Sequence, residues 1–425
     1  MKKFPLILLF SLLSWCTGIG QDQSFLYKDH TYLDNIRSVK FFLGDVYISY
    51  PIIRLGSGQQ LTLIFDDLST NATYYTYRLI HCDKDWRPSN LSELEYLEGF
   101  SGERIDDFQY SFKTRTPFVN YQLKLPNEDI TWTKSGNYLL VVFDADRGQI
   151  PAFTRRFVVV EDLVRIQPAM TRTAVVGKSR THHEIDFLVN HEYLDIRNPR
   201  AEISATLLQN GRWDNAMQGL APFIIKGKSL VFDYTDQIVF PAGKEFRYLD
   251  MRSLRFGSEN ISTIETYEDG FEVMLFRDNK RLERPTVFRN DLNGNFVIET
   301  TDQRDFDLSG DYARVLFSLY SPTVYDDHDL YVVGGFNGWQ LNPENKMVYN
   351  NSVNGYVAKI LLKQGYYDYA YALVPRSGSI RQLDTAEIEG DWFETNNDYS
   401  ILIYYKPFGG RYDQVIGSLT FQSGN

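Results

Sequence analysis

The sequence predicts an all-β protein built from tandem β-sandwich domains. Short runs in which apolar and polar residues alternate recur along the chain, and an alternation with a period of two is typical of β-strands. Turns that contain glycine, asparagine or aspartate separate many of these runs. Aromatic residues, which favour strands, make up 15% of the chain, with 29 tyrosines, 29 phenylalanines and 6 tryptophans.

The first 20 residues have the composition of a secretory signal peptide. Two lysines precede an apolar run over residues 4–15, which is too short to cross a bilayer, and small residues follow it. We expect cleavage after Gly20 and export of the chain. Cys16 suggests a lipoprotein as an alternative, but Trp15 stands before it, where a small residue is normal at such a site.

The mature chain is expected to be acidic. Removing two of the 44 basic residues leaves 42 against 55 acidic ones, a net charge near −13. No basic stripe offsets this negative charge, so we do not expect nucleic acid to be a partner. Cys82 is then the single cysteine, so no internal disulfide can form and stability must come from core burial. No later segment is apolar and long enough for a transmembrane helix.

Residues 21–162 form the first predicted sandwich. Its candidate strands have the number and spacing of an immunoglobulin-like domain, although the paired cysteines of such domains are absent. A short helix is predicted over residues 91–97. The candidate strands cover residues 39–43, 46–50, 61–65, 74–82, 121–125, 138–143 and 153–160.

Two further sandwiches are predicted, a middle one over residues 163–310 and a C-terminal one over residues 311–425. The Asn210-Gly211 and Asn293-Gly294 pairs favour tight turns with positive φ, and an acidic linker over residues 302–311 marks the boundary. In the last unit, residues 361–370 are expected to form a hairpin. The strands predicted in the two units cover residues 164–168, 184–189, 201–209, 229–232, 271–277, 296–299, 313–320, 329–333 and 358–362.

Polar residues close the predicted strand at residues 74–82. His81, Asp83 and Asp85 would share one face of a strand and could bind a metal ion. The favoured interpretation is that the carboxylates accept hydrogen bonds from loop amides instead. We expect Cys82 to be buried and unreactive, and no Gly-x-Ser-x-Gly elbow is present. The sequence therefore predicts no catalytic centre, no metal site and no cofactor.

A second polar segment contains Asp291, Asn293 and Asn295, and it partly matches a calcium-binding loop. Such a loop needs a closing glutamate at its twelfth position, where this chain has Asp302. A turn explains the segment better.

The segment His81-Cys82-Asp83-x-Asp85-Trp86-x-Pro88-Ser89-x-Leu91 is similar to the signature of the type IX secretion system plug proteins of Bacteroidetes. Shorter similarities follow in order along the chain, up to a closing segment that runs from Tyr404 to Asp413. The resemblance implies a non-enzymatic periplasmic protein, peripheral to the inner face of the outer membrane. Such a protein would dock on the periplasmic opening of the giant translocon barrel (SprA/Sov type) and seal the idle pore. The predicted partner contacts are Trp86, Tyr96 and Phe100.

The last predicted sandwich carries a second resemblance. The segment Gly335-Phe336-Asn337-Gly338-Trp339, between a strand and glycine-tyrosine pairs, is similar to early-set sandwiches of the glycogen-binding type. Related modules bind glucans by stacking exposed tryptophans on sugars, so a periplasmic carbohydrate-binding protein is the alternative function; packing within the sandwich is the competing explanation. The predicted glycan-binding residues are Asn337, Trp339, Tyr367 and Trp392.

Overall fold

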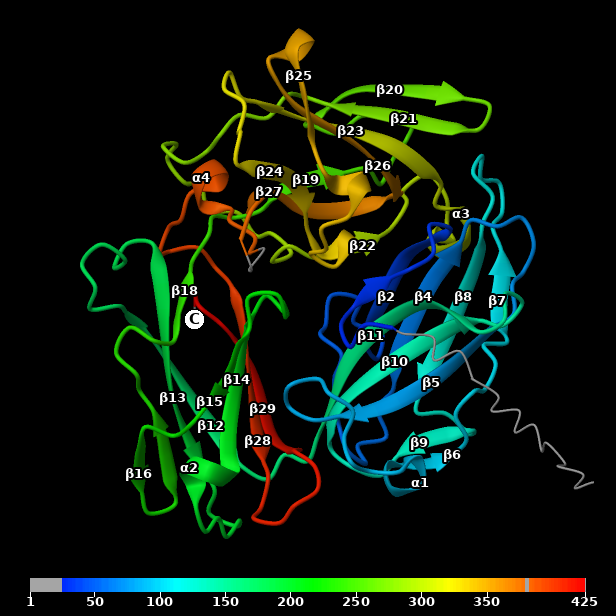
Figure 1. Cartoon of the computed structure of the whole chain (residues 1–425). Helices are drawn as coiled ribbons and strands as arrows, with labels where there is room; N and C mark the ends of the chain where they lie inside the picture. The colour runs from blue at the N-terminus through cyan, green and yellow to red at the C-terminus, as the bar shows by residue number, and fades with distance from the viewer. Residues whose placement is uncertain (1–24, 379–381, 425) are drawn as a thin grey trace, which may run out of the picture.

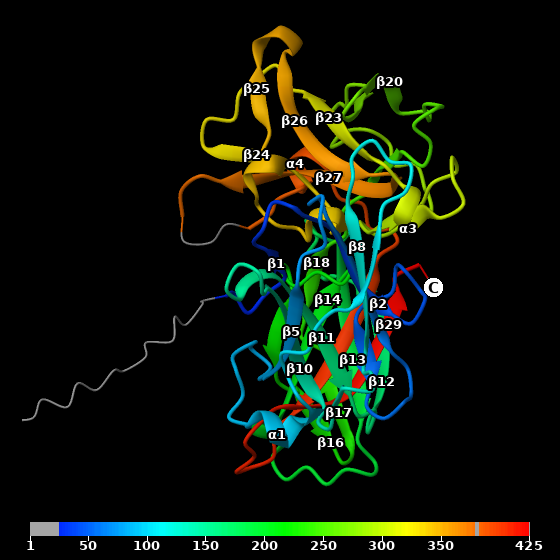
Figure 2. The ribbon, with the colours of Figure 1, turned by 90° about the vertical axis from the view of Figure 1, so that its right-hand side faces the viewer.

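The computed structural model describes residues 25–378 and 382–424, and these fold into three β-sandwiches (Figure 1). The predicted all-β class is confirmed. In Figure 1 the first sandwich lies at the lower right, the middle one at the lower left, and the third across the top; Figure 2 shows the third still above the other two after a 90° turn. The predicted signal peptide, over residues 1–20, lies outside the described residues. No helix within the described ranges has the length and apolar character needed to span a membrane.

The first sandwich packs a sheet with the order β1-β11-β10-β5 against a second with the order β2-β4-β8-β7. β3 adds to the first sheet beside β11, and β6 pairs with β9 separately. The core between the sheets is aromatic: Phe65 stacks on Tyr121 at 5.0 Å, and Tyr75 meets both rings edge-on. The elements are β1 His30–Thr31, β2 Ile36–Leu43, β3 Ile52–Arg54, β4 Leu61–Asp67, β5 Tyr75–Cys82, α1 Glu93–Tyr96, β6 Leu97–Gly99, β7 Asp107–Tyr110, β8 Val119–Leu125, β9 Ile130–Trp132, β10 Gly136–Asp144 and β11 Ile150–Val160.

Six of the seven strands predicted in this sandwich are present. Residues 46–50 form turns instead, because the Ser49 hydroxyl accepts a hydrogen bond from the amide of Leu43 and donates one to the carbonyl of Val46. The predicted helix shrinks to the single turn α1, where the Glu95 carboxylate accepts a hydrogen bond from the amide of Ser92 at 2.8 Å.

The middle sandwich is discontinuous in sequence, which corrects the predicted domain boundaries. One sheet has the order β12-β13-β17-β16 with β18 beside β13, and the facing sheet has the order β15-β14-β28-β29. Because β28 pairs with β14 from Ile203↔Tyr405 to Gln209↔Tyr399, the last two strands belong here and not to a C-terminal domain. The elements are β12 Arg165–Arg172, β13 His182–Asn190, α2 Pro199–Glu202, β14 Ile203–Gln209, β15 Met217–Leu220, β16 Ile224–Lys226, β17 Ser229–Phe232, β18 Val239–Pro241, β28 Asp398–Tyr405 and β29 Gln414–Gln422.

The third sandwich is inserted between β18 and β28. It packs a sheet with the order β19-β27-β22, with β24 beside β27, against one with the order β20-β21-β23-β26-β25. The acidic stretch at residues 302–311 lies inside it, where Asp305 caps α3, and so it is no domain boundary. The elements are β19 Arg247–Asp250, β20 Ile261–Tyr267, β21 Gly270–Leu275, β22 Phe296–Ile298, α3 Phe306–Ser309, β23 Tyr312–Tyr320, β24 His328–Val333, η1 Gly335–Asn337, η2 Pro343–Asn345, β25 Val348–Asn350, η3 Asn351–Val353, β26 Gly355–Lys363, β27 Gly365–Pro375 and α4 Ala386–Glu389.

The hairpin predicted at residues 361–370 is wrong, because β26 and β27 lie in opposite sheets of this sandwich. The chain crosses from one sheet to the other at Gly365, where the carbonyl of Val297 comes close to the backbone. A Cβ atom there would lie 2.4 Å from that oxygen, so the position accepts only glycine.

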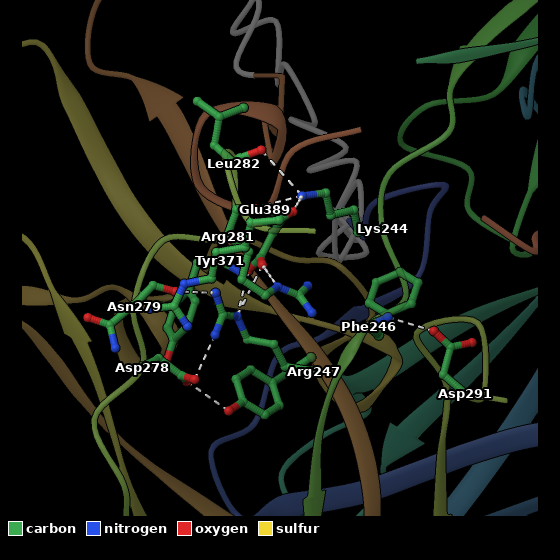
Figure 3. A network of polar contacts seen from close by, with 12 residues as sticks. Lys244, Phe246, Arg247, Asp278, Asn279, Arg281, Leu282, Asp291, Tyr371 and Glu389 are labelled. Atoms are coloured by element: carbon green, nitrogen blue, oxygen red, sulfur yellow. Dashed lines mark hydrogen bonds and ion pairs between the residues drawn. The ribbon is translucent and has the colours of Figure 1, made fainter. Parts of the chain in front are cut away.

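A buried ionic network ties together the segments through which the chain enters and leaves the third sandwich (Figure 3). Arg247, at the start of β19, donates to Glu389 at 3.0 Å and to Asp278 at 2.6 Å, and Arg281 also donates to Glu389, at 2.7 Å. Close by, the amide of Trp392 donates to the carbonyl of Gly243. The arginines and carboxylates of this network all belong to the third sandwich, so it joins the entering and leaving segments of that sandwich to each other.

Candidate functional site at the junctions of the first sandwich

Strand β5 ends in a tight turn that is built on Asp83. One oxygen of the Asp83 carboxylate accepts hydrogen bonds from the amides of Asp85 and Arg87, both at 2.9 Å, and Trp86 takes the left-handed conformation with φ of 62°. The carboxylate shapes the loop, which confirms the favoured interpretation. Among residues 25–378 and 382–424, no group of three or more His, Cys, Asp and Glu side chains could hold a metal ion.

His81 is buried among tyrosine rings beside this turn. Its Nε2 donates to the carbonyl of Ser135 at 3.1 Å, and its ring lies 5.0 Å from that of Tyr138 and 5.4 Å from that of Tyr412. Burial lowers the pKa of His81 to about 4, so the ring is neutral at pH 7. Burial likewise raises the pKa of the Cys82 thiol to about 12, which leaves it unreactive as predicted.

Trp86 faces the middle sandwich. Its ring meets that of Trp213 edge-on at 4.9 Å, and the guanidinium of Arg156 lies 5.2 Å from one ring centroid and 5.0 Å from the other. Asp29 fixes this guanidinium with an ion pair of 2.9 Å. The tryptophan of the signature segment therefore contacts a partner domain within its own chain.

The signature segment and the closing segment, which are far apart in sequence, meet at this junction. The amide of Lys84 donates to the carboxylate of Asp413 at 3.1 Å, and the hydroxyl of Tyr404 donates to Asn137 at 2.9 Å. Asn137 in turn donates to the carbonyl of Asp83 at 3.1 Å. The two segments that carried the plug resemblance thus form one packed interface between the first and middle sandwiches.

The junction between the first and third sandwiches depends on buried charge instead. Asp66 on β4 forms an ion pair of 2.7 Å with Lys363 on β26, and the hydroxyl of Tyr312 donates to the same carboxylate at 2.7 Å. Asn120 satisfies the other carboxylate oxygen at 2.7 Å. The Lys363 ammonium also lies 4.0 Å from the ring centroid of Phe118.

The structure corrects two of the three predicted partner contacts. Trp86 and Tyr96 are each only 6% exposed, because Trp86 packs against Trp213 and Tyr96 lies in the core of the first sandwich, so neither can face a translocon. Phe100 is 74% exposed and stays a prediction. Sequence reasoning missed Leu94 on α1 and Phe408 between β28 and β29, which are 82% and 97% exposed.

These exposed apolar side chains lie at one end of the first and middle sandwiches. Phe100 directly precedes Ser101, whose amide donates to Glu93 of α1, and Leu94 follows Glu93 in the same helical turn. Arg411, three residues after Phe408, forms a two-bond ion pair with Glu95 of α1 at 2.6 and 3.1 Å. Phe408 lies in the turn between β28 and β29, outside the alternating pattern of either strand, so the sequence carried no signal for its exposure.

The predicted glycan platform is not assembled. Tyr367 is a core residue that stacks on Phe296 at 5.5 Å, with its hydroxyl bonded to a carbonyl inside the sandwich. The guanidinium of Arg212 lies 4.0 Å from the Trp339 ring centroid and covers the ring face on which a sugar would stack. Asn337 closes its own turn by donating to Val332, and Trp392 lies in the segment that leaves the third sandwich. The packing explanation is therefore the better one, and the early-set type of this sandwich stays a prediction.

Residues 36–161 match the family model described as the type 9 secretion system plug protein 1st domain. A crystal structure of a hypothetical protein from Parabacteroides merdae ATCC 43184 superimposes with a TM-score of 0.90 at 33% identity, covering 94% of this chain and 100% of that one. Residues 36–161 therefore carry a first domain of the type 9 secretion system plug family. This match points to a role in type 9 secretion.

Two other comparisons add nothing to the plug assignment. Native alpha-2-macroglobulin from Escherichia coli, spanning domains NIE-MG1, gives a TM-score of 0.14 at 10% identity, covering 46% of this chain and 98% of that one, and supports no argument. No protein with a curated description matches the chain.

Proposed function

We propose that the protein is a non-enzymatic periplasmic plug that docks on the giant outer-membrane translocon barrel of the type 9 system and seals its idle pore. The single observation that carries this proposal is the match of residues 36–161 to the plug first domain. The buried junctions support it, because an obstruction needs domains that do not move apart. The exposed face that a plug requires is supplied by Leu94, Phe100 and Phe408.

The proposal is tested by isolating the tagged protein from outer membranes. We expect the translocon barrel to co-purify with the wild-type chain, and a strain that lacks the protein to have a leakier outer membrane. Recovery of the soluble protein alone, together with an unchanged permeability, would contradict the plug function.

The docking face is tested separately with the double variant Phe100→Ser/Phe408→Ser. We expect it to retain the folded state, because neither side chain is part of a core, and to lose most of the co-purifying barrel. The matched control is Phe256→Ser, since Phe256 is a 78% exposed phenylalanine of the third sandwich. Equal recovery of the barrel with the double variant and the control would refute this face but not the plug function.

A further inference from the structure

A cavity of about 630 Å³ lies where the three sandwiches meet. The first sandwich lines it with residues of β1, β2 and β11, the middle one with residues 208–214, and the third with residues 293–296 and 335–342. Lys28 and Gly338 belong to the lining and are exposed, so solvent reaches the cavity. Its volume is in the range of small-molecule sites, about 300–1,000 Å³.

The lining is cationic although the protein is acidic. It contains five lysine and arginine side chains but two aspartates, and each aspartate already pairs with an arginine: Asp29 with Arg156 at 2.9 Å, and Asp214 with Arg212 at 2.6 Å. The cations that form no ion pair with any described residue are Lys28, Lys40 and Arg155.

Lys40 is the most informative of these three cations. It is 7% exposed, its ammonium donates to the side-chain oxygen of Asn295, and the ring centroid of Phe296 lies 4.4 Å away. One neutral acceptor does not replace the water that an ammonium with three donors loses on burial. Burial accordingly lowers the pKa of Lys40 to about 7.

Arg155 on β11 also donates to no carboxylate of the described chain. Its guanidinium donates to the carbonyls of Thr154 at 2.8 Å and His30 at 3.4 Å and to the hydroxyl of Thr31 at 3.3 Å. Burial lowers the pKa of His30, a hydrogen bond with Gln340 raises it, and the charges of Lys28 and Arg155 lower it further. Asp29, which forms its ion pair with Arg156, also acts on Arg155 through its charge.

We propose that this cavity binds a small polyanion that carries carboxylate or phosphate groups, held by Lys40 and Arg155 from inside and by Lys28 at the margin. A buried ammonium without an ion-pair partner, as at Lys40, raises the free energy of the empty protein, and an anion recovers that free energy through charge-assisted hydrogen bonds. Because all three sandwiches line the cavity, the bound anion would also hold them together. This inference is independent of docking on a translocon.

The test is isothermal titration calorimetry on the mature chain, with citrate in one arm and inorganic pyrophosphate in the other, at constant ionic strength. We expect saturable binding in at least one arm, and the arm that binds identifies the ligand as a carboxylate or a phosphate. Lys40→Met should weaken binding about tenfold or more. The control Lys124→Met, which removes an exposed lysine of β8, should bind like the wild type.

Arg155→Gln provides a second variant in case Lys40→Met does not fold, and circular dichroism establishes the fold of each. We expect the same loss of affinity from Arg155→Gln, because the glutamine keeps hydrogen bonding but removes the charge. Absence of saturable binding in both arms would overturn the proposal. So would affinities for both anions that Lys40→Met and Arg155→Gln leave unchanged.

Discussion

Two buried lysines lie in the region where the first and third sandwiches meet, and only one of them has a counter-charge. Lys363, 2% exposed, pairs with Asp66 at 2.7 Å, whereas Lys40, 7% exposed, has a neutral amide oxygen as its acceptor. A buried charge stabilises a fold only when a partner offsets the lost hydration. The ion pair of Lys363 with Asp66 therefore stabilises the fold, whereas the buried charge of Lys40 destabilises it.

The largest effect is expected from Lys363→Met. This change leaves the Asp66 carboxylate buried without its cation, which should lower the free energy of unfolding by about 3–5 kcal/mol. Adding Asp66→Asn should restore part of that loss, because asparagine keeps hydrogen bonds to Asn120 and Tyr312 but carries no charge. Urea unfolding of both single variants and the double variant gives the coupling energy. Strictly additive losses would show that the two charges do not act as a pair.

Trp86→Ala tests the junction with the middle sandwich, where the indole rings of Trp86 and Trp213 meet beside the Arg156–Asp29 ion pair. Removal of the indole leaves a cavity against Trp213, and we expect a loss of about 3 kcal/mol. Trp86→Phe should lose less, since most of the ring volume remains. If both variants cost the same, then ring packing does not determine the stability of this junction.

The strands of the first sandwich were predictable because alternation with a period of two is a local signal. The strand that pairs with β14 was not predictable. Nothing in the sequence around Ile203 indicates that this residue pairs with Tyr405, which follows the inserted sandwich. For this reason the last two strands, β28 and β29, were assigned to the wrong sandwich. Pairing between distant segments is decided by tertiary packing and not by local pattern.

The signature segment was recognised from sequence, but the orientations of Trp86 within it and of Tyr96 after it were not. An aromatic residue suits an interface and a core equally well. The sequence therefore predicts Trp86 and Tyr96 as partner contacts, whereas the structure buries both. The same ambiguity affected Tyr367, whose stacking on Phe296 depends on β22 lying beside β27. The cationic cavity had no sequence signal at all, because its lining comes from all three sandwiches.

Lys40→Met should act in the opposite direction to Lys363→Met. It removes a poorly hydrated charge, so we expect the free energy of unfolding at pH 7, without added polyanion, to rise by about 1 kcal/mol. The pKa of Lys40 is about 7 in the folded chain and 10.5 in the reference state. The unfolded chain therefore binds more protons between these pH values, and the Lys40 contribution makes wild-type stability rise with pH across that window.

The measurement is urea unfolding of the wild type and Lys40→Met at several pH values between 7 and 10.5. The difference between the two proteins should shrink as the pH increases. The charged or titratable groups that line the same cavity, and that are present in both proteins, are Lys28, Asp29, His30, Arg155, Arg156, Arg212 and Asp214. A difference that stays constant with pH would contradict a lowered pKa for Lys40.

The smallest effect on stability is expected from Arg411→Ala, which breaks an ion pair in water. The Arg411–Glu95 contact of 2.6 Å is as short as the buried Asp66–Lys363 contact, yet both of its side chains are exposed. Hydrogen bonds from Arg411 and then from Ser92 lower the pKa of Glu95 to about 2, so any stabilisation is present above pH 4.5 and is lost as the pH falls toward 2.

In Arg411→Ala we expect the pKa of Glu95, followed by NMR titration, to move back toward 4.5. At high salt, Arg411→Ala and the wild type should have the same urea midpoint, because salt screens exposed charges. A loss of stability comparable to that of Lys363→Met would mean that contact distance, and not burial, determines the strength of these pairs. A much smaller loss of stability than in Lys363→Met would mean that the loss of water around Asp66 and Lys363, and not the contact distance, makes the buried pair the stronger one.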